Sequence, residues 1–304
     1  MTLPRSIAAA LGAAGTALAL GTGVASAATA TALRHDVLSG TSSNWAGYAV
    51  SDPGAGTGTT PTSFATVSGS WMQPAATCTA GSPGYSAFWV GLGGFADGSR
   101  ALEQIGTEAD CSAGGTPSTS VWYELVPAPA VDVSLTVQPG DLINASVTVS
   151  GTSVTLTIAD ATSGASFTKT LTVASPDTSS AEWIAESPSS CGGFRGGCRP
   201  LPLANFGTVS FTGASTTGSG HVGTIGDPAW SATAITLNGS SQSRFPGDRF
   251  GIAAALSTAT PGPLASDGAS FSVTWQQVAP SVSTGSGFPG AGRGWGRRPH
   301  SWGR

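Results

Sequence analysis

Hydrophobic and polar residues alternate along much of the chain, which is the pattern of β-strands with one buried face. The clearest alternating runs cover residues 131–137, 143–149, 154–158 and 167–173, and Pro-Gly or Ser-Gly pairs separate them. Short runs bounded by turn residues are typical of antiparallel sheets. Beyond the N-terminal segment, no stretch shows the 3.6-residue apolar period of a helix. The pattern therefore predicts an all-β fold, a lectin-like antiparallel β-sandwich of two large curved sheets.

The N-terminal segment, residues 1–27, follows a different pattern. It combines one Arg with an apolar run and ends in Ala-Ser-Ala at 25–27, the small-residue pattern that precedes signal-peptidase cleavage. No later stretch reaches the roughly 18 apolar residues that a membrane helix needs. We therefore expect a secreted, extracellular protein that has no membrane contact once the signal peptide is removed.

The remaining chain divides into three parts. Residues 28–40 are a short lead or propeptide, and residues 41–278 form the β-sandwich domain. Residues 279–304 are rich in Gly, Ser, Pro and Arg and lack any periodicity, so this tail is expected to be disordered. A monomer is predicted.

Four cysteines, Cys78, Cys111, Cys191 and Cys198, occur in this exported chain, so two disulfides are expected. Cys191 and Cys198 enclose only six residues. A local pairing is therefore the simplest arrangement, and it leaves Cys78 with Cys111. Four cysteines allow three pairings, so the connectivity stays open at this point. Their spacing does not resemble a zinc site.

The predicted domain is acidic. Between residues 28 and 280, seven Lys and Arg face sixteen Asp and Glu, a net charge of −9 (7 − 16). This balance argues against nucleic acid as a partner. The chain also has few carboxylates whose protonation would unfold it, so acid tolerance is a reasonable hypothesis.

The residue inventory excludes several reaction types. His221 is the one His of the predicted domain, and neither a nucleophile-elbow motif nor an HExxH motif accompanies it. Paired cysteines leave no free thiol, and the glycines lie in turns rather than in a phosphate-binding loop. Carboxylates and amides remain, since a Glu can act as general base and then general acid, and an amide NH₂ can stabilise an oxyanion.

The segment AEWIAE at 181–186 holds two of the chain's five Glu. On a strand, side chains alternate between faces, so Glu182, Ile184 and Glu186 share one face and Trp183 points to the other. A solvent-facing position is the commoner explanation for any single polar residue on a strand. Two acids on one face beside a Trp nevertheless indicate a candidate site.

Seven segments, taken in order, resemble the glutamic peptidases, also called eqolisins or peptidase family G1, secreted acid proteases best known from fungi. The resemblance covers about residues 42–213, and CGGFRGGC (191–198) falls where family members have a small disulfide loop. The segments are SNWAGYAV (43–50), TVSGSWMQP (66–74), FWVGLGG (88–94), LEQIG (102–106), VWYELVP (121–127), AEWIAE (181–186) and PLANFGTVSFTG (202–213).

The resemblance implies an active site on the concave face of the sandwich, with a Gln and a Glu as catalytic dyad. The family's Gln, in a hydrophobic-x-Q-x-G stretch, falls on Gln104, and its Glu, the second acid of the A-E-aromatic-I-x-E strand, falls on Glu186. Glu182 shares that strand face as a supporting or solvent-facing acid. The other positions that match site-lining or supporting residues are Trp45, Trp89, Trp122, Glu124 and Glu108.

The implied reaction is peptide-bond hydrolysis at acid pH on polypeptide substrates, without a cofactor. Ionised Glu186 takes a proton from water, the Gln104 amide holds the oxyanion, and Glu186 returns the proton to the leaving amine. Two positions depart from the fungal pattern. Gly93 and Glu108 stand where the fungal members have Asp, so the pH optimum and the subsite preference can differ.

Two other functions fit the same residues. An exported carbohydrate- or cell-wall-binding β-sandwich would stack sugars on the Trp side chains and would not need Gln104 or Glu186. A glycoside hydrolase would pair Glu186 with Glu182 or Glu124. Glu182 and Glu186 lie four positions apart on a strand, roughly 13 Å, which exceeds the roughly 5–9.5 Å that this chemistry uses. The pair of Glu186 with Glu124 stays open.

Overall fold

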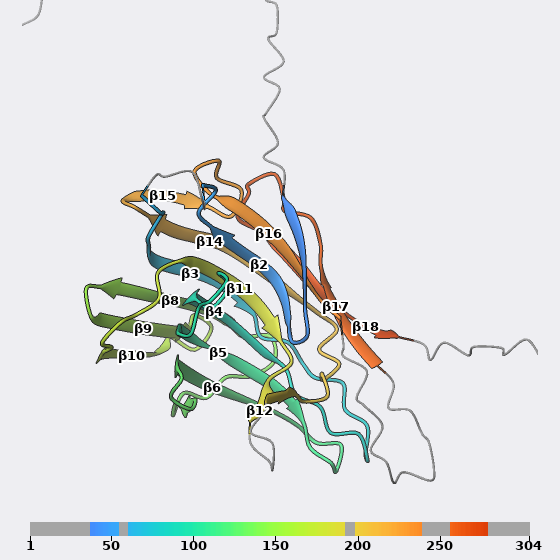
Figure 1. Ribbon diagram of the computed structural model, residues 1–304. Coiled ribbons are helices and arrows are strands. Elements are labelled where there is room, and N and C mark those ends of the chain that lie inside the picture. Colours follow the sequence, from blue (N-terminus) through green and yellow to red (C-terminus); the bar gives the residue numbers. More distant parts are fainter. Residues whose placement is uncertain (1–36, 55–59, 192–197, 239–255, 279–304) are drawn as a thin grey trace, which may run out of the picture. The chain divides into compact units, whose positions relative to one another are not determined.

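The computed structural model describes residues 37–54, 60–191, 198–238 and 256–278 (Figure 1). These residues all belong to one compact unit within residues 35–304. Their regular structure consists of β-strands, which confirms the predicted all-β class. None of the described residues forms a helix that could cross a membrane.

Eighteen strands make up this structure. They are β1 (Leu38–Ser42), β2 (Trp45–Ser51), β3 (Phe64–Met72), β4 (Ala87–Gly93), β5 (Leu102–Cys111), β6 (Pro117–Val126), β7 (Val131–Asp132), β8 (Leu142–Ser150), β9 (Ser153–Asp160), β10 (Ala165–Thr172), β11 (Ser180–Glu186), β12 (Ser189–Cys191), β13 (Cys198–Pro200), β14 (Thr208–Gly218), β15 (His221–Thr224), β16 (Ser231–Leu237), β17 (Leu256–Pro261) and β18 (Phe271–Val278).

Hydrogen bonds join sixteen of these strands into one sheet, in the order β10-β9-β8-β3-β14-β18-β17-β16-β2-β11-β4-β5-β6-β7, with β1 on β16 and β15 on β14. The strands pair antiparallel, except that β1 runs parallel to β16. A separate two-stranded sheet, β12 with β13, follows the strand that carries the AEWIAE segment.

The large sheet folds over itself into two layers. Strands β4 and β5 contact β8, and β11 contacts β3, although these strands are not neighbours in the hydrogen-bonding order. One layer is therefore β10-β9-β8-β3-β14 and the other is β2-β11-β4-β5-β6. The predicted sandwich is confirmed, with one difference: the layers are continuous through β18, β17 and β16 instead of being separate sheets.

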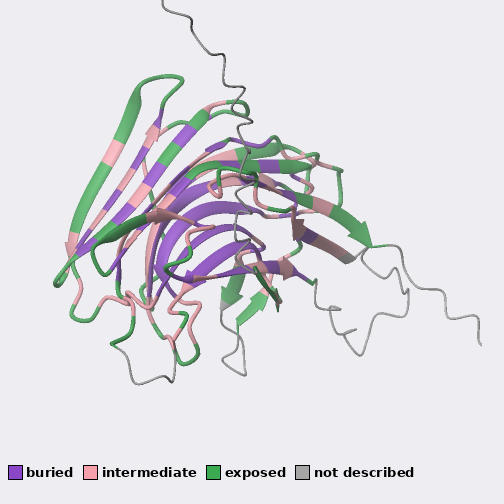
Figure 2. Cartoon of the chain, turned by 90° about the horizontal axis from the view of Figure 1, so that it is seen from above, coloured by how far each residue is buried: buried purple, intermediate pink, exposed green. Residues whose placement is uncertain are grey.

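The main core lies between the layers, where Figure 2 shows the buried residues concentrated on the curved strands. Trp183 is fully buried there, as the strand alternation predicts. Its indole Nε1 donates to the Ser68 carbonyl at 2.8 Å. A Cβ at Gly69 would come within 2.8 Å of the Trp183 ring, so glycine at this position leaves room for the indole. The opposite face of β11 is thereby free to carry Glu182 and Glu186.

The alternating run at residues 131–137 differs from its prediction. Only Val131–Asp132 forms a strand, β7, whereas the next three runs form β8, β9 and β10. The Val133 amide donates to the Val121 carbonyl at 2.8 Å, and the Leu135 amide turns back to the Val133 carbonyl at 2.8 Å. Both side chains still pack against the core. The alternation therefore reflects burial of one face without a continuous hydrogen-bonded partner.

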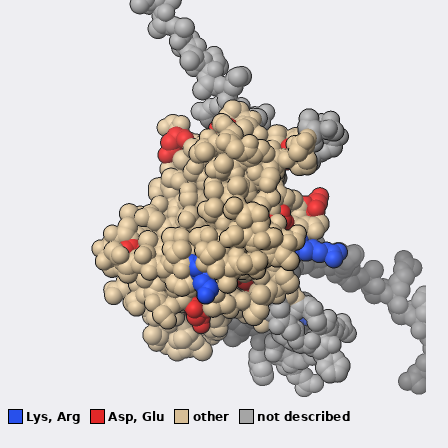
Figure 3. Space-filling view, turned by 90° about the vertical axis from the view of Figure 1, so that its left-hand side faces the viewer, with Lys and Arg blue, Asp and Glu red and all other residues tan. Residues whose placement is uncertain are grey.

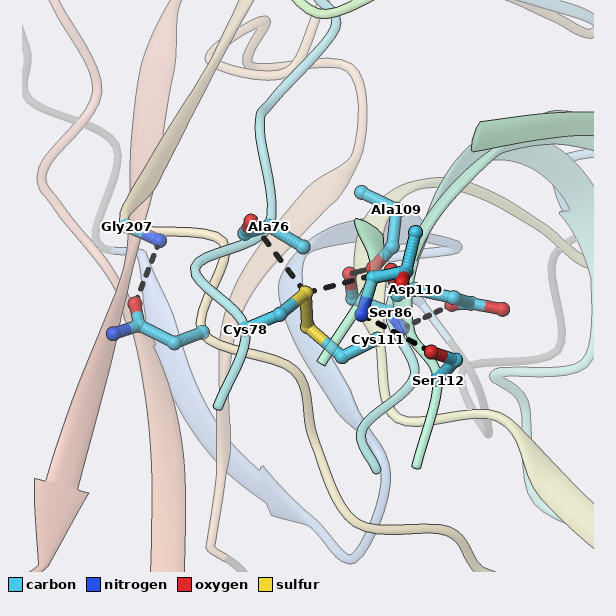
Figure 4. The surroundings of a disulfide bond; sticks show 10 residues. Ala76, Cys78, Ser86, Ala109, Asp110, Cys111, Ser112 and Gly207 are labelled. Atoms are coloured by element: carbon cyan, nitrogen blue, oxygen red, sulfur yellow. Dashed lines mark hydrogen bonds between the residues drawn. A yellow bond between two sulfur atoms is a disulfide. The ribbon is translucent and has the colours of Figure 1, made fainter. Parts of the chain in front are cut away.

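The Cys78–Cys111 disulfide is confirmed, with a Cα–Cα distance of 5.3 Å (Figure 4). It ties the segment after β3 to the end of β5. Cys198 is disulfide-bonded as well, and it faces Cys191 in the register of β12 and β13. The Cys191 side chain lies outside the described residues, so this second pairing stays a prediction.

The surface carries few charges, and the face in Figure 3 shows only scattered acidic and basic side chains. Hydroxyl groups supply much of the polarity on the outer strands, for example the Thr155–Thr170 pair at 3.0 Å. At the N-terminal end, β1 begins at Leu38 and pairs with β16, so the last residues of the predicted lead take part in the sheet. The predicted signal peptide and tail lie outside the described residues.

Candidate active site

Strands β11, β4, β5 and β6 present rows of side chains on the face that points away from the main core. Residues in register stand side by side across the antiparallel strands. The second hydrophobic cluster, which includes Trp89, Trp122 and Ile184, belongs to this face. The rows are Glu186–Ala87–Glu108–Ser120, Ile184–Trp89–Gly106–Trp122 and Glu182–Gly91–Gln104–Glu124. Every predicted site residue except Trp45 lies in this array, and Trp45 stands opposite Glu186 on β2.

Gly106, in the LEQIG segment, allows β4 and β5 to pack closely under the site. A Cβ at this position would lie 2.3 Å from the Phe88 carbonyl oxygen and 2.6 Å from the Trp89 Cβ. Only glycine fits without displacing the backbone of β4. The position of Gln104, two residues earlier on β5, therefore depends on this glycine.

The Glu186 carboxyl group is held by two N–H donors. Trp89 Nε1 donates to Oε2 at 2.7 Å, and Asn44 Nδ2 donates to Oε1 at 2.9 Å. Trp45 packs edge-on against Trp89 with ring centroids 5.0 Å apart. Each oxygen of the carboxyl group therefore has a fixed neighbour. The side chain keeps partial solvent access.

Burial raises the pKa of Glu186 to about 7, despite these donors. Desolvation is the largest cause, because it disfavours the charged form. The hydrogen bonds from Trp89 and Asn44 and a smaller contribution from Trp45 lower the pKa, and the charge of Glu124 raises it. Because the pKa of about 7 lies above the pH of an acid solution, the Glu186 carboxyl is mostly neutral there.

Gln104 and Glu124 form a second hydrogen-bonded pair on the adjacent strands. Gln104 is 4% exposed, and its Nε2 donates to Glu124 Oε2 at 2.7 Å. Its Oε1 has no hydrogen-bond partner among the described residues. Burial raises the pKa of Glu124, and Glu124 in turn influences Glu186. Glu124 is thus coupled to both members of the predicted dyad.

A cleft of about 610 Å³ opens over these groups and brings most of the predicted residues together. Trp89 and Glu182 do not line it: Trp89 acts through its bond to Glu186, and Glu182 is covered. A second cavity, of about 500 Å³, contains no predicted catalytic residue. The predicted residues that line the cleft are Trp45, Gln104, Glu108, Trp122, Glu124 and Glu186.

Glu182 is fully buried, so the solvent-facing position considered for it is wrong. Neither of its carboxyl oxygens has a hydrogen-bond partner among the described residues. Glu103, also fully buried, accepts from the Asp177 amide. Burial raises the pKa of Glu182 well above its ordinary value and that of Glu103 to about 7. Among the described residues, no three such groups are arranged to hold a metal ion.

These raised pKa values predict a protein that is more stable in acid than at neutral pH. Unfolding exposes Glu103, which then releases its proton near pH 4.5, whereas the folded protein holds that proton until about pH 7. The unfolded state therefore binds fewer protons in this window, and the free energy of unfolding falls as pH rises. Glu103 alone accounts for a loss on the order of 3 kcal/mol. Urea unfolding at pH 4 and pH 7.5 measures the difference.

The matched variant for this prediction is Glu103→Gln, which keeps the shape and removes the titration. Its free energy of unfolding should change less between pH 4 and pH 7.5 than that of the wild type. Equal or greater stability of the wild type at pH 7.5 would contradict the prediction.

Two residues of the site were not singled out from the sequence. Asn44 bonds Glu186 directly, and Ser42 bonds the Asn44 side chain. Asn44 lies in the quoted SNWAGYAV segment, next to Trp45. The sequence did offer one indication of a role for Asn44: it is a polar residue directly before Trp45, which was predicted to line the site. The 142-residue separation from Glu186 gave no hint of the contact.

Comparison with known proteins agrees with this geometry. A model of the Peptidase A4 family matches residues 43–244, about two thirds of the chain. The chain belongs to this family. Membership in the Peptidase A4 family confirms the resemblance to glutamic peptidases and makes the chain a glutamic endopeptidase. The carbohydrate-binding module and the glycoside hydrolase are thereby set aside.

Individual glutamic peptidases are also similar to this chain in sequence and in structure. Aspergillopepsin-2 from Aspergillus niger is 29% identical over 222 residues, which cover 66% of this chain and 72% of the relative. Scytalido-glutamic peptidase, solved with a transition state analog inhibitor, is 25% identical with a TM-score of 0.58. That match covers 77% of this chain and 98% of the solved chain. A second structure of it, with a peptide-based analog, has a TM-score of 0.56 at 24% identity and the same coverage.

Proposed function

We propose that this Peptidase A4 member is an exported acid endopeptidase in which Glu186 transfers protons and Gln104 stabilises the tetrahedral intermediate. One observation carries the proposal: the Glu186 carboxyl lies between two N–H donors in a cleft that Gln104 also lines. Scytalido-glutamic peptidase was solved with a transition state analog inhibitor, and this likeness supports a hydrolytic function here.

Export and partners are part of the same proposal. The Ala-Ser-Ala at 25–27 after an apolar run and the Cys78–Cys111 disulfide both support an extracellular protein. The substrates are polypeptides, and the net negative charge of the domain disfavours nucleic acid. We propose a monomer without membrane contact after signal removal.

The raised pKa of Glu186 changes the first step that the sequence suggested. With a pKa of about 7, the neutral carboxyl predominates at acid pH, so the reaction starts from that form instead of the ionised one. A neutral carboxyl can do two things at once. Its carbonyl oxygen accepts a proton from water while its hydroxyl oxygen gives its own proton to the scissile carbonyl.

Water then adds to the scissile carbon, and the product is a neutral tetrahedral diol with Glu186 again neutral. Gln104 Nε2 has one N–H on Glu124 and a second for the substrate oxygen, where negative charge develops in the transition state. In the second step the Glu186 hydroxyl protonates the amide nitrogen. Its other oxygen takes a proton from the diol, and the C–N bond breaks to give acid and amine.

The pH dependence follows from this protonation state. We expect kcat/KM to be highest at acid pH and to fall tenfold per pH unit above about 7, as Glu186 ionises. A series of kcat/KM measurements on one fluorogenic peptide between pH 3 and pH 8.5 tests this. A rate that rises toward pH 7 from the acid side would mean that ionised Glu186 begins the reaction.

Digestion of a denatured protein substrate between pH 2 and pH 7 tests the function itself. The full chain is incubated with and without pepstatin, which inhibits the unrelated aspartic proteases. Pepstatin-resistant cleavage at acid pH supports the proposal. Folded protein that cleaves nothing over this range, also after trimming of the segment before Leu38, would overturn it.

A further inference from the structure

We propose that Asn44, held by Ser42, is a positioning residue for Glu186 that fixes the direction of its carboxyl group and sets how firmly the group keeps its proton. This inference rests on the proposed role of Glu186. This relay of hydrogen bonds runs from Ser42, at the end of β1, through Asn44, just before β2, to Glu186 at the end of β11, 142 residues after Asn44.

The hydroxyl of Ser42 has a defined direction. Its Oγ accepts from the backbone amides of Asn44 at 3.3 Å and Trp45 at 3.2 Å. With these two donors on its oxygen, the hydroxyl proton is free to point at Asn44 Oδ1, 3.1 Å away. Ser42 thus acts as donor toward the Asn44 side chain.

That donor decides which way the Asn44 carboxamide faces. Oδ1 is the acceptor for Ser42, so Nδ2 points at Glu186 Oε1 at 2.9 Å. The flipped amide would put Oδ1 against Glu186 Oε1, and at the other end Nδ2 would be a third N–H donor to Ser42 Oγ, whose hydroxyl proton would lose its acceptor. The Asn44 side chain therefore presents an N–H to Glu186.

The backbone around this relay is anchored from two sides. The Asn44 carbonyl accepts from the Ser187 amide at 2.8 Å, directly after Glu186. Ser42 is the last residue of β1 and stands opposite Leu237 of β16. A shift of Asn44 relative to Glu186 would break these bonds, so the donor is preorganised.

Both neutral and charged groups surround Glu186 besides Asn44. From β4 and β2 come the neutral Trp89 and Trp45, and from β6 comes the acidic Glu124. Glu108 of β5 and Arg100 of the loop between β4 and β5 line the same cleft. Trp89 and Asn44 are the side chains that donate to Glu186 at less than 3 Å, one on each oxygen. Removal of Asn44 thus leaves Oε1 without this donor.

The effect on protonation has a definite sign. A donor to the carboxylate favours the ionised form, so its loss raises the pKa of Glu186 above about 7. A hydrogen bond to a charged group corresponds to about one pH unit or somewhat more. In Asn44→Leu, Glu186 should therefore titrate higher by about one pH unit.

Carboxyl NMR measures this titration without any need for catalysis. The chain has five Glu, so side-chain ¹³C labelling gives five Glu signals. The Glu186 signal is the one missing from Glu186→Gln. Its midpoint is compared in wild type, Asn44→Leu and Ser42→Ala, with folding checked by circular dichroism. We expect an upward shift in both Asn44→Leu and Ser42→Ala, with the smaller shift in Ser42→Ala.

Asn44→Asp provides an isosteric second variant if Asn44→Leu fails to fold. It places a second carboxyl group about 3 Å from Glu186 Oε1, where two like charges cannot both ionise easily. The pair should lose its protons in two separate steps, one below and one above the wild-type midpoint. The pH dependence of kcat/KM should shift in the same direction as the titration. In Asn44→Leu and Asn44→Asp, kcat/KM should therefore begin to fall at a higher pH than in the wild type.

Ser70 and Asn144 supply a matched control. Ser70 Oγ donates to Asn144 Oδ1 at 2.6 Å, the same kind of pair on the other layer, far from the cleft residues in the sheet order. Asn144→Leu and Ser70→Ala should leave the Glu186 midpoint unchanged. An unchanged midpoint in Asn44→Leu and Asn44→Asp, with equal loss of activity at every pH, would overturn the inference. An active Glu186→Gln would instead overturn the proposed function.

Discussion

Glu186→Gln is expected to lower kcat/KM by about 10²–10⁴ at acid pH, the usual contribution of a positioned proton-transfer group. The substitution keeps the size and shape of the side chain and removes both of its chemical roles. An amide cannot take a proton from water and cannot deliver one to the leaving nitrogen. Since Asn44 and Trp89 both donate to this side chain, one of the two hydrogen bonds is also lost.

The measurement is kcat/KM on one fluorogenic peptide at three acid pH values, with thermal unfolding as a check on the fold. Glu103→Gln is the matched control, because Glu103 is buried on β5 but does not line the cleft. It makes the same chemical change and should keep the activity within a few-fold. Retained activity in Glu186→Gln would mean that another acid, with Glu124 as the next candidate, carries the reaction.

Strand alternation predicted several features of this site from the sequence alone. It placed Trp183 in the core and Glu186 on the opposite face, as the structure shows. The family motifs selected Gln104 and Glu124 as members of one site, and these two residues pair in register on β5 and β6. Such residues are predictable because a short motif fixes both the local strand and the side-chain direction.

Contacts between distant segments were not predictable in this way. The bond from Asn44 to Glu186 depends on β2 pairing with β11, and a single sequence does not encode that pairing in any local pattern. The burial of Glu182 depends on residues that cover it from other elements. The raised pKa of Glu186 follows from its own burial by other elements, so its protonation state, and with it the proposed first step, required the structure.

Gln104→Ala is expected to lower kcat/KM by about 10²–10³, the typical cost of losing one donor to a developing oxyanion. The loss should fall mainly on kcat, because the amide interacts more strongly with the transition state than with the ground-state carbonyl. Gln104 is suited to this role because Glu124 occupies one N–H of Nε2 and fixes the direction of the other. Steady-state kinetics at the acid optimum measures kcat and KM separately.

Gln73 provides the matched control for this prediction. It is likewise a buried Gln whose Nε2 makes one hydrogen bond, at 2.9 Å to the Glu108 carbonyl, and its Oε1 has no partner among the described residues. Gln73→Ala should lower the free energy of unfolding about as much as Gln104→Ala while kcat stays near the wild-type value. Gln104→Met separates donor from shape, because its side chain has nearly the same length and lacks any N–H or O–H donor at acid pH. Full kcat in Gln104→Met, or a loss confined to KM, would show that Gln104 binds the substrate without stabilising the transition state.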